Sequence, residues 1–302
     1  MIYSYLLMCL IYGTTFYAIK AGIDAGFSPF LFAAIRFGTA GVLIIAFLYL
    51  KKSSLRFTRR NMLDLIYLGV CMTLIPFAAL YWAEQYISSG LAALLSASGP
   101  IIVSVLSLCF DRKKMPLWQW MGLLIGFAGI GLVVFPHLEI GVSTLWLLGS
   151  AGILLSEAVF AWGAIFSKRL LSGGLTPLAV NGFQMFFGSI GLLVLSLMFE
   201  PIHFTFSQPY TAVGALFYLI VFGSIIASGI YYWLVKRTNP LFPSTWLYVS
   251  PVIALAVGAV FLDEPIYPLG IAGTVLVIGG VILTSFRDWQ KMWKSAHHAA
   301  KS

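Results

Sequence analysis

Two charged residues stand within long apolar stretches of this sequence. Glu157 lies in the middle of the segment LLSEAVFAWG, and Arg36 lies about two helical turns into the stretch that begins FSPFLFAAIRF. A buried carboxyl group can carry a proton or pair with an ammonium group, whereas a guanidinium group can clamp a carboxylate. Because charges at membrane depth are costly, such residues face protein or a water-filled cavity. Both are therefore candidates for contact with a charged group of a small molecule.

Hydroxyl side chains lie beside prolines that interrupt the apolar stretches. Pro76, Pro100 and Pro251 each remove a backbone donor and leave a carbonyl group without its helical partner. At membrane depth such a break is tolerated only beside protein, polar groups or a cavity. Ser96 and Ser98 precede Pro100 and can either satisfy the freed groups or offer them to a bound molecule. A simple packing kink is the alternative.

Aromatic residues are unusually frequent near the ends and breaks of the apolar stretches. Most such rings are typical of the membrane interface. Tyr12 and Trp162 lie inside their stretches, so we expect them to line a cavity, and flat amphipathic rings suit an organic molecule better than an ion. The predicted substrate-binding residues are Tyr12, Arg36, Tyr81, Trp82, Ser96, Ser98, Glu157, Trp162, Gln184, Tyr232 and Trp246, and Glu157 is also the candidate for proton coupling.

The composition places the elements that carry these residues in lipid. Of the 302 residues, 60% are hydrophobic and only 9% are charged, and such a chain cannot hide its apolar stretches inside one soluble core. The stretches long enough to span about 30 Å of hydrocarbon cover residues 2–20, 29–50, 63–84, 89–110, 116–135, 144–167, 177–198, 210–234, 241–262 and 268–286. The sequence therefore predicts an all-α integral membrane protein with ten transmembrane helices.

The loops between these stretches alternate in charge. Basic residues follow the second, fourth, sixth, eighth and tenth stretches, whereas the other loops are acidic and carry Lys20 as their only base. By the positive-inside rule we expect both termini in the cytoplasm and the chain in the cell membrane. The net charge of +8 thus reflects membrane topology and not nucleic-acid binding. Residues 287–302 form a short basic tail, expected to be solvated or to touch lipid headgroups.

The chain repeats itself with a nearly constant offset. Lys20, Gly26 and Pro29 recur as Lys168, Gly174 and Pro177 at an offset of 148, and Tyr81, Trp82 and Pro100 recur as Tyr232, Trp233 and Pro251 at an offset of 151. Because each half has five helices, an odd number, the second half must enter the membrane from the opposite face. The sequence predicts two inverted repeats, residues 1–137 and 144–286, with a site between them. The alternative is a duplicated unit whose copies merely pack together.

The repeat also bears on the roles of the two deep charges. The counterpart of Arg36 is the neutral Gln184, which favours bracing of a broken helix by Arg36 over a carboxylate clamp. For Glu157 two roles remain open. One is proton coupling or binding of a substrate ammonium group, and the alternative is a protonated acid that is hydrogen-bonded to a neighbouring helix.

Four segments carry a family resemblance: WAEQYISSGLAALLSASGP, FSPFLFAAIRF, AWGAIFSKR and FLDEPIYPLG. They resemble both EamA-type repeats of the drug/metabolite transporter superfamily, and the resemblance covers essentially the whole chain. It implies a ten-helix transporter of small metabolites, usually amino acids and related compounds, with a central cavity between the halves. In one departure from the family, the acidic residue at the junction of the fourth and fifth helices is Arg112 here, whereas Glu264 matches it in the second half.

We expect a secondary transporter that exports a small organic metabolite by alternating access, with proton coupling or uncoupled facilitation left open. An uptake permease or an efflux pump for toxic compounds is the alternative. The absence of a phosphate-binding GxxxxGK[ST] loop argues against ATP-driven pumping, and the four histidines lack the helical spacing of metal ligands. A lipid-modifying enzyme and an ion channel fit less well. The expected partners are a small-molecule substrate and membrane lipid, without cofactor or metal, for a monomer or homodimer.

Overall fold

A computed structural model describes most of the chain. The described residues are 1–51, 58–111, 115–135, 143–200, 207–250, 252–253 and 268–299. Every regular element in these ranges is a helix. Within them, seven helices are long and apolar enough to cross a membrane, and two shorter apolar helices cover Leu117–Leu132 and Pro268–Thr284. The chain is therefore an all-α, multi-pass membrane protein.

The count of ten transmembrane helices stays a prediction. Part of the ninth predicted stretch, residues 254–262, lies outside the described ranges, and so do Arg112, Pro251 and Glu264. The tenth stretch is part of a helix that continues to Ala299, so most of the predicted tail extends that helix.

In the described ranges, seven α-helices and one π-helical segment form the first half. They are α1 (Ile2–Asp24), α2 (Pro29–Leu50), α3 (Arg59–Gly69), the π-helical segment η1 (Val70–Leu74), α4 (Ile75–Ala83), α5 (Ser89–Ser96), α6 (Gly99–Asp111) and α7 (Leu117–Val134). The third predicted stretch is thus continuous through α3, η1 and α4, while the fourth is broken between α5 and α6. Pro100 lies at the second position of α6, where its missing N–H costs no helical bond.

The second half begins with the long helix α8. The elements that the structure describes are α8 (Thr144–Ser172), α9 (Pro177–Phe199), α10 (Pro209–Tyr218), the π-helical segment η3 (Leu219–Ala227), α11 (Ser228–Arg237), α12 (Leu241–Ser244) and α14 (Pro268–Ala299). Here α10, η3 and α11 form one continuous rod, as α3, η1 and α4 do in the first half. Both rods contain a π-helical segment, an uncommon element that often marks a functional site.

The turns after α1 and α8 have the same backbone conformation at one glycine. Gly26 has φ 115° and Gly174 has φ 104°, a left-handed conformation that glycine adopts without a Cβ penalty. The next helix starts in both turns with a proline, Pro29 in α2 and Pro177 in α9. Proline suits a first helical position because its N–H would be unpaired there anyway.

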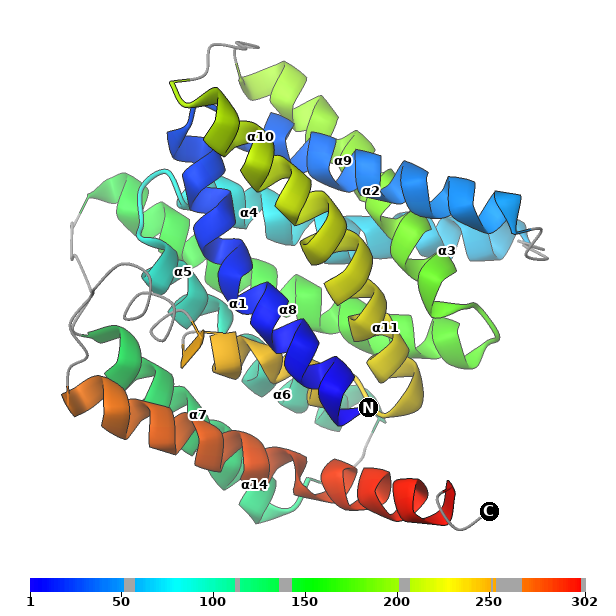
Figure 1. The fold of residues 1–302 in the computed structure, drawn as a ribbon, viewed down its shortest axis with the longest axis vertical. Coiled ribbons are helices and arrows are strands. Elements are labelled where there is room, and N and C mark those ends of the chain that lie inside the picture. Colours follow the sequence, from blue (N-terminus) through cyan, green and yellow to red (C-terminus); the bar gives the residue numbers. More distant parts are fainter. Residues whose placement is uncertain are drawn as a thin grey trace.

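Helices from the two halves pack side by side. In Figure 1, α2 lies along α9, and α7 lies along α14. Moreover, α1 contacts α10, η3 and α11, whereas α8 contacts α3, η1 and α4. The first helix of each half thus packs on the third helix of the other half. One buried apolar cluster likewise contains side chains from both halves, including Tyr5, Leu68 and Leu234.

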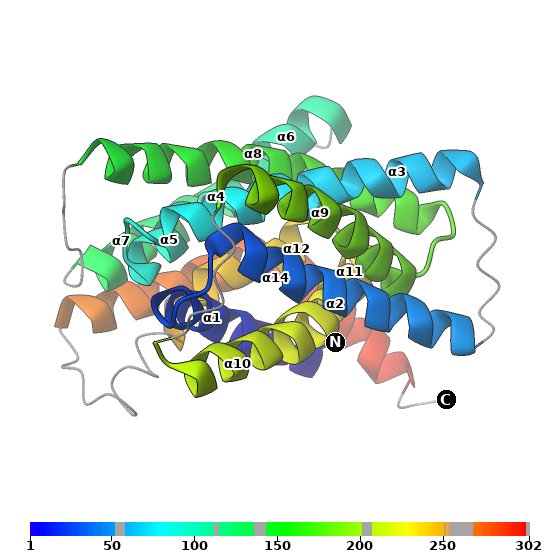
Figure 2. The same cartoon turned by 90° about the horizontal axis from the view of Figure 1, so that it is seen from above.

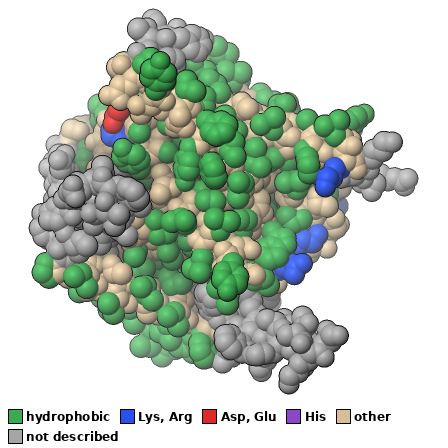
Figure 3. Space-filling model, viewed as in Figure 1, with side chains coloured by type: hydrophobic (Ala, Val, Ile, Leu, Met, Phe, Trp, Pro, Cys, Tyr) green, Lys and Arg blue, Asp and Glu red, His purple; other side chains and the backbone are tan. Residues whose placement is uncertain are grey.

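The two ends of the chain lie at the same end of the bundle. Figures 1 and 2 show the start of α1 and the end of α14 on the same side of the molecule. The outward faces are apolar, with exposed side chains such as Leu155, Leu197 and Phe217. Figure 3 shows hydrophobic side chains over much of one face, and most of the basic side chains in view toward its right edge. Such a surface fits lipid contact along the sides of the bundle.

Close contact between α7 and α14 depends on glycine. A Cβ atom added to Gly280 would lie 2.5 Å from the backbone nitrogen of Gly126, whereas one added to Gly279 would meet nothing within 4 Å. We expect Gly280→Ala to destabilise the folded protein by about 1–3 kcal/mol, the usual cost of overpacking. Gly279→Ala is the matched control, expected to be neutral or slightly stabilising. Thermal unfolding in detergent measures both, and equal melting temperatures for the two variants would contradict this packing.

Candidate functional site

A cavity lies between the two halves of the chain. Its walls include seven of the predicted residues, Tyr12, Arg36, Ser96, Glu157, Gln184, Tyr232 and Trp246, and its empty space with its opening measures about 830 Å³. Most other lining residues are apolar or aromatic, among them Phe16, Met72, Phe77 and Phe160. The site thus combines an apolar wall with a few polar groups.

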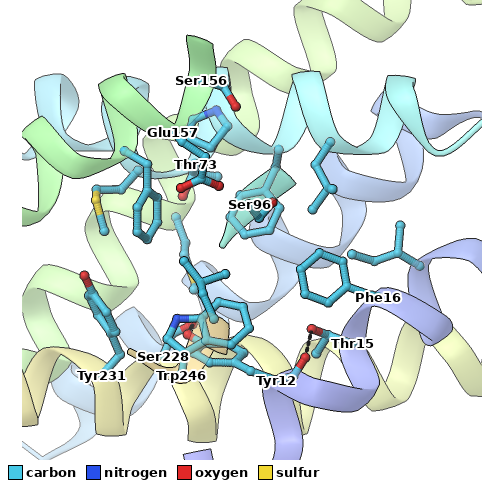
Figure 4. A pocket seen from close by; sticks show the side chains of 18 of the residues that line it. Tyr12, Thr15, Phe16, Thr73, Ser96, Ser156, Glu157, Ser228, Tyr231 and Trp246 are labelled. Atoms are coloured by element: carbon cyan, nitrogen blue, oxygen red, sulfur yellow. Dashed lines mark hydrogen bonds between the residues drawn. The ribbon is translucent and has the colours of Figure 1, made fainter. Parts of the chain in front are cut away.

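Glu157 extends from α8 into this cavity. Figure 4 shows its carboxyl group pointing inward, on the side opposite Tyr12 and Trp246. The residue is only 8% exposed, and its Oε2 atom has no hydrogen-bond partner among the described residues. The hydroxyl group of Ser96 interacts with the carboxyl group from α5. Glu157 therefore has one oxygen atom available for a bound molecule.

Arg36 is held from α2 by two hydroxyl groups. Its Nε donates to Ser224 Oγ at 2.9 Å, and its Nη1 donates to the Tyr81 hydroxyl at 2.9 Å. Its guanidinium carbon lies 4.5 Å from the centroid of the Phe37 ring and 5.4 Å from that of Phe77. The residue is 2% exposed. Within the described parts of the chain no carboxylate forms an ion pair with it.

Gln184 occupies the corresponding place on α9. Its Oε1 accepts a hydrogen bond of 2.6 Å from Thr73 Oγ1. Thr73 belongs to η1 just as Ser224 belongs to η3. Each second helix therefore reaches the π-helical segment of the opposite half through one side chain.

Aromatic rings form the wall opposite Glu157. The centroids of the Tyr12 and Trp246 rings are 4.3 Å apart, and the Tyr12 hydroxyl pairs with Ser228 Oγ at 2.7 Å. Two polar atoms of this wall are buried without partners in the described part of the chain, namely Trp246 Nε1 and the Tyr232 hydroxyl oxygen. The wall opposite the carboxyl group therefore holds one N–H donor and one hydroxyl group without hydrogen-bond partners in the described chain.

Four predicted residues do not line the cavity. Tyr81 lies behind Arg36 and bonds to it, while Trp82 packs edge-on against Tyr86 with ring centroids 5.1 Å apart. Ser98 follows the end of α5, and its hydroxyl oxygen is buried without a partner in the described chain. Trp162, expected in the cavity wall, instead donates from Nε1 to the Tyr67 hydroxyl at 2.7 Å. These residues support the site or lie away from it.

Sequence reasoning missed several lining residues. They include Thr15, Thr73, Ser156, Ser228 and Tyr231. One signal for Thr73 was available, because Thr73 and Ser224 are separated by the same offset of 151 as Tyr81 and Tyr232. For the others, the sequence alone does not indicate which face of the helix turns inward.

The lone base of the acidic loops has a structural partner. Lys20 Nζ donates to the carbonyl oxygen of Glu84 at 2.8 Å and pairs with Asp24 at 3.2 Å. Its repeat counterpart, Lys168, donates to the carbonyl oxygens of Val235 at 2.9 Å and Lys236 at 2.8 Å. Lysines are favourable at helix C-termini because they bond the last carbonyl groups. Both lysines thus hold the end of the third helix of their own half.

Known proteins match the chain along nearly its whole length. The EamA-like transporter family matches residues 1–135 and 147–286. The inner membrane transporter YedA of Escherichia coli K12 is 28% identical over 278 residues, which make up 91% of this chain and 87% of that protein. The transporter YoaV of Bacillus subtilis is 27% identical over 283 residues, 92% of this chain and 94% of that protein.

A solved crystal structure has the same fold. It superimposes with a TM-score of 0.76 at 17% sequence identity and covers 94% of this chain and 95% of its own. At that identity the likeness concerns the fold alone.

Proposed function

Because the chain belongs to the EamA-like transporter family and is a membrane transporter, not an enzyme, we propose that it exports a small zwitterionic metabolite. Amino acids and related compounds are the cargo class that we favour. The observation that carries this proposal is a buried cation and a buried carboxyl group in one cavity, neither of which has an oppositely charged partner there.

A zwitterion complements these unpaired groups. The guanidinium group of Arg36 has donors to offer to a carboxylate, and Oε2 of Glu157 can accept from an ammonium group. Burying a charge is costly unless it is paired and hydrogen-bonded, so a cargo that supplies both counterions binds at a lower desolvation cost. Trp246 Nε1 and the Tyr232 hydroxyl provide further bonds to polar cargo atoms.

We propose that transport occurs by alternating access between two inverted five-helix repeats. Three features support this view: the matching glycine turns, the π-helical segments in both third helices, and the reciprocal contacts of first and third helices across the halves. Inverted repeats in transporters typically enclose a site near the middle of the membrane, and one repeat rocks against the other. Ten transmembrane helices are part of this proposal.

The proposed orientation follows from charge. Lys51, Arg59, Arg169 and Arg237 lie at helix ends that share one end of the bundle with the start of α1 (Figure 1). The positive-inside rule then assigns both termini to the cytoplasm, in the cell membrane. Coupling of export to protons through Glu157 belongs to the proposal, and uncoupled facilitation is its alternative.

A flux assay with purified protein in liposomes tests the proposal. We expect an α-amino acid to cross faster than its amide, which lacks the carboxylate, and faster than the matching acid without the amino group. Imposing pH gradients of both signs separates proton coupling from facilitation, and protein of known orientation resolves the direction. Equal rates for the three compounds would rule out recognition of a zwitterion, and faster inward flux would favour an uptake permease.

The aromatic wall supports a second candidate, efflux of toxic aromatic compounds. The Tyr12 and Trp246 rings, which pack against each other at a tilt, offer a large apolar surface that does not require a charged cargo. In the same assay, rapid transport of an uncharged aromatic compound together with slow transport of amino acids would favour this reading.

A further inference from the structure

We propose that Thr73 and Ser224 are positioning residues for transport. Each holds the π-helical segment of one half against the second helix of the other half. Through these two bonds, Gln184 and Arg36 connect the cavity to the two third helices. Only the transport measurements with cargo rest on the proposed function, because the hydrogen-exchange measurements need no cargo.

The two bonds occupy equivalent places in the repeat. Arg36 Nε donates to Ser224 Oγ at 2.9 Å, and Thr73 Oγ1 donates to Gln184 Oε1 at 2.6 Å. Arg36 and Gln184 are separated by 148 residues, and Thr73 and Ser224 by 151, the two offsets of the repeat. None of the four side chains is more than 2% exposed. Both bonds are therefore shielded from water. Removing one partner of a buried hydrogen bond is costly, because the other partner is left unsatisfied.

Side chains hold backbone carbonyl groups of the π-helical segment η3. A π-helix is a rare, wide form in which backbone carbonyl groups leave the regular α-helical pattern. In η3 these groups are met by side chains: Asn181 Nδ2 donates to the Ser224 carbonyl oxygen at 3.1 Å, and Ser228 Oγ donates to the Gly223 carbonyl oxygen at 3.1 Å. The hydroxyl group of Ser224 provides a further contact of η3, because it accepts a hydrogen bond from Arg36.

The links reach the cavity wall. Arg36, Thr73 and Gln184 line the cavity, whereas Ser224 lies behind it. A guanidinium group has five N–H donors in one rigid plane, so turning it toward a bound anion also moves the Nε donor that holds Ser224. Filling the cavity therefore changes the support of η3, and Gln184 offers the equivalent route to η1.

Hydrogen exchange of the full-length protein in lipid nanodiscs tests these links without any cargo. We expect Ser224→Ala to raise amide exchange in residues 219–227 by about two- to tenfold, and Thr73→Val to do the same in residues 70–74, the effect of losing one buried hydrogen bond. Each variant leaves the other segment unchanged. Ser167→Ala is the matched control, because Ser167 is equally buried and, in the described part of the chain, its hydroxyl bonds only to Ala164 of its own helix α8.

Conservative substitutions test whether an effect comes from the lost hydrogen bond or from misfolding. Ser224→Thr and Thr73→Ser place in each half the hydroxyl residue of the other half, and we expect both to keep the protection. Arg36→Gln copies Gln184, so we expect it to retain protection of η3 while cargo affinity falls. In transport, Ser224→Ala lowers the maximal rate about two- to tenfold and leaves KM within about twofold.

Two results would overturn the proposal. One is unchanged exchange of residues 219–227 in Ser224→Ala. The other is an increase in hydrogen exchange throughout the chain that the conservative substitutions fail to prevent. That result would indicate that the two hydroxyl groups contribute to general packing and not to the two π-helical segments. If no zwitterion is transported while the two segments respond as expected, the proposed function fails and the positioning role stands.

Discussion

Replacement of Glu157 by Gln lowers transport of a zwitterionic cargo by about ten- to a hundredfold. A hydrogen bond to a charged group contributes about 1.5–3 kcal/mol, and about 1.4 kcal/mol corresponds to a factor of ten. Glutamine keeps the shape of the side chain but can neither become an anion nor release a proton. The initial rate in liposomes at several pH values measures the effect.

Ser156→Ala is the matched control for Glu157. Ser156 precedes Glu157 on α8 and also lines the cavity, but its hydroxyl donates to the Ile153 carbonyl oxygen of its own helix at 2.8 Å. Its removal is therefore expected to leave transport nearly unchanged. If Glu157→Gln shows the rate and the pH profile of the wild type, Glu157 has no part in cargo binding or in proton coupling.

Trp246→Ala raises KM for an organic cargo by about tenfold or more. The substitution removes the ring that packs on Tyr12 and the unpaired Nε1 donor. Aromatic contacts contribute about 0.5–1.5 kcal/mol beyond the burial of their area, and the lost apolar surface adds to this. Trp246→Phe keeps a ring but not the donor, so the difference between the two variants isolates the hydrogen bond.

Trp162→Ala provides the comparison for this experiment. Trp162 is also a partly buried tryptophan within a helix, yet it bonds Tyr67 and does not line the cavity. We expect its loss to lower stability while KM stays close to that of the wild type. A similar increase in KM for both tryptophan variants would show that general destabilisation, and not contact with cargo, explains the result for Trp246.

The contrast between Tyr12 and Trp162 shows where sequence reasoning reached its limit. Both were expected in the cavity wall because both lie inside apolar stretches, but only Tyr12 lines it. Position along a helix is a local property that the chain reveals directly. The direction of a side chain depends on the neighbouring helices, and in lipid the outward face is as apolar as the buried one, so periodicity gives little help.

By itself the sequence determined the membrane class and the all-helical fold, because the length and apolarity of each stretch are local quantities. It also identified the residues that recur at offsets of 148 and 151, including Arg36 and Gln184. Only the tertiary structure decided that Arg36 meets Ser224 and that Gln184 meets Thr73, each across the two halves. Contacts between residues more than a hundred positions apart follow from how helices pack, and no local pattern encodes them.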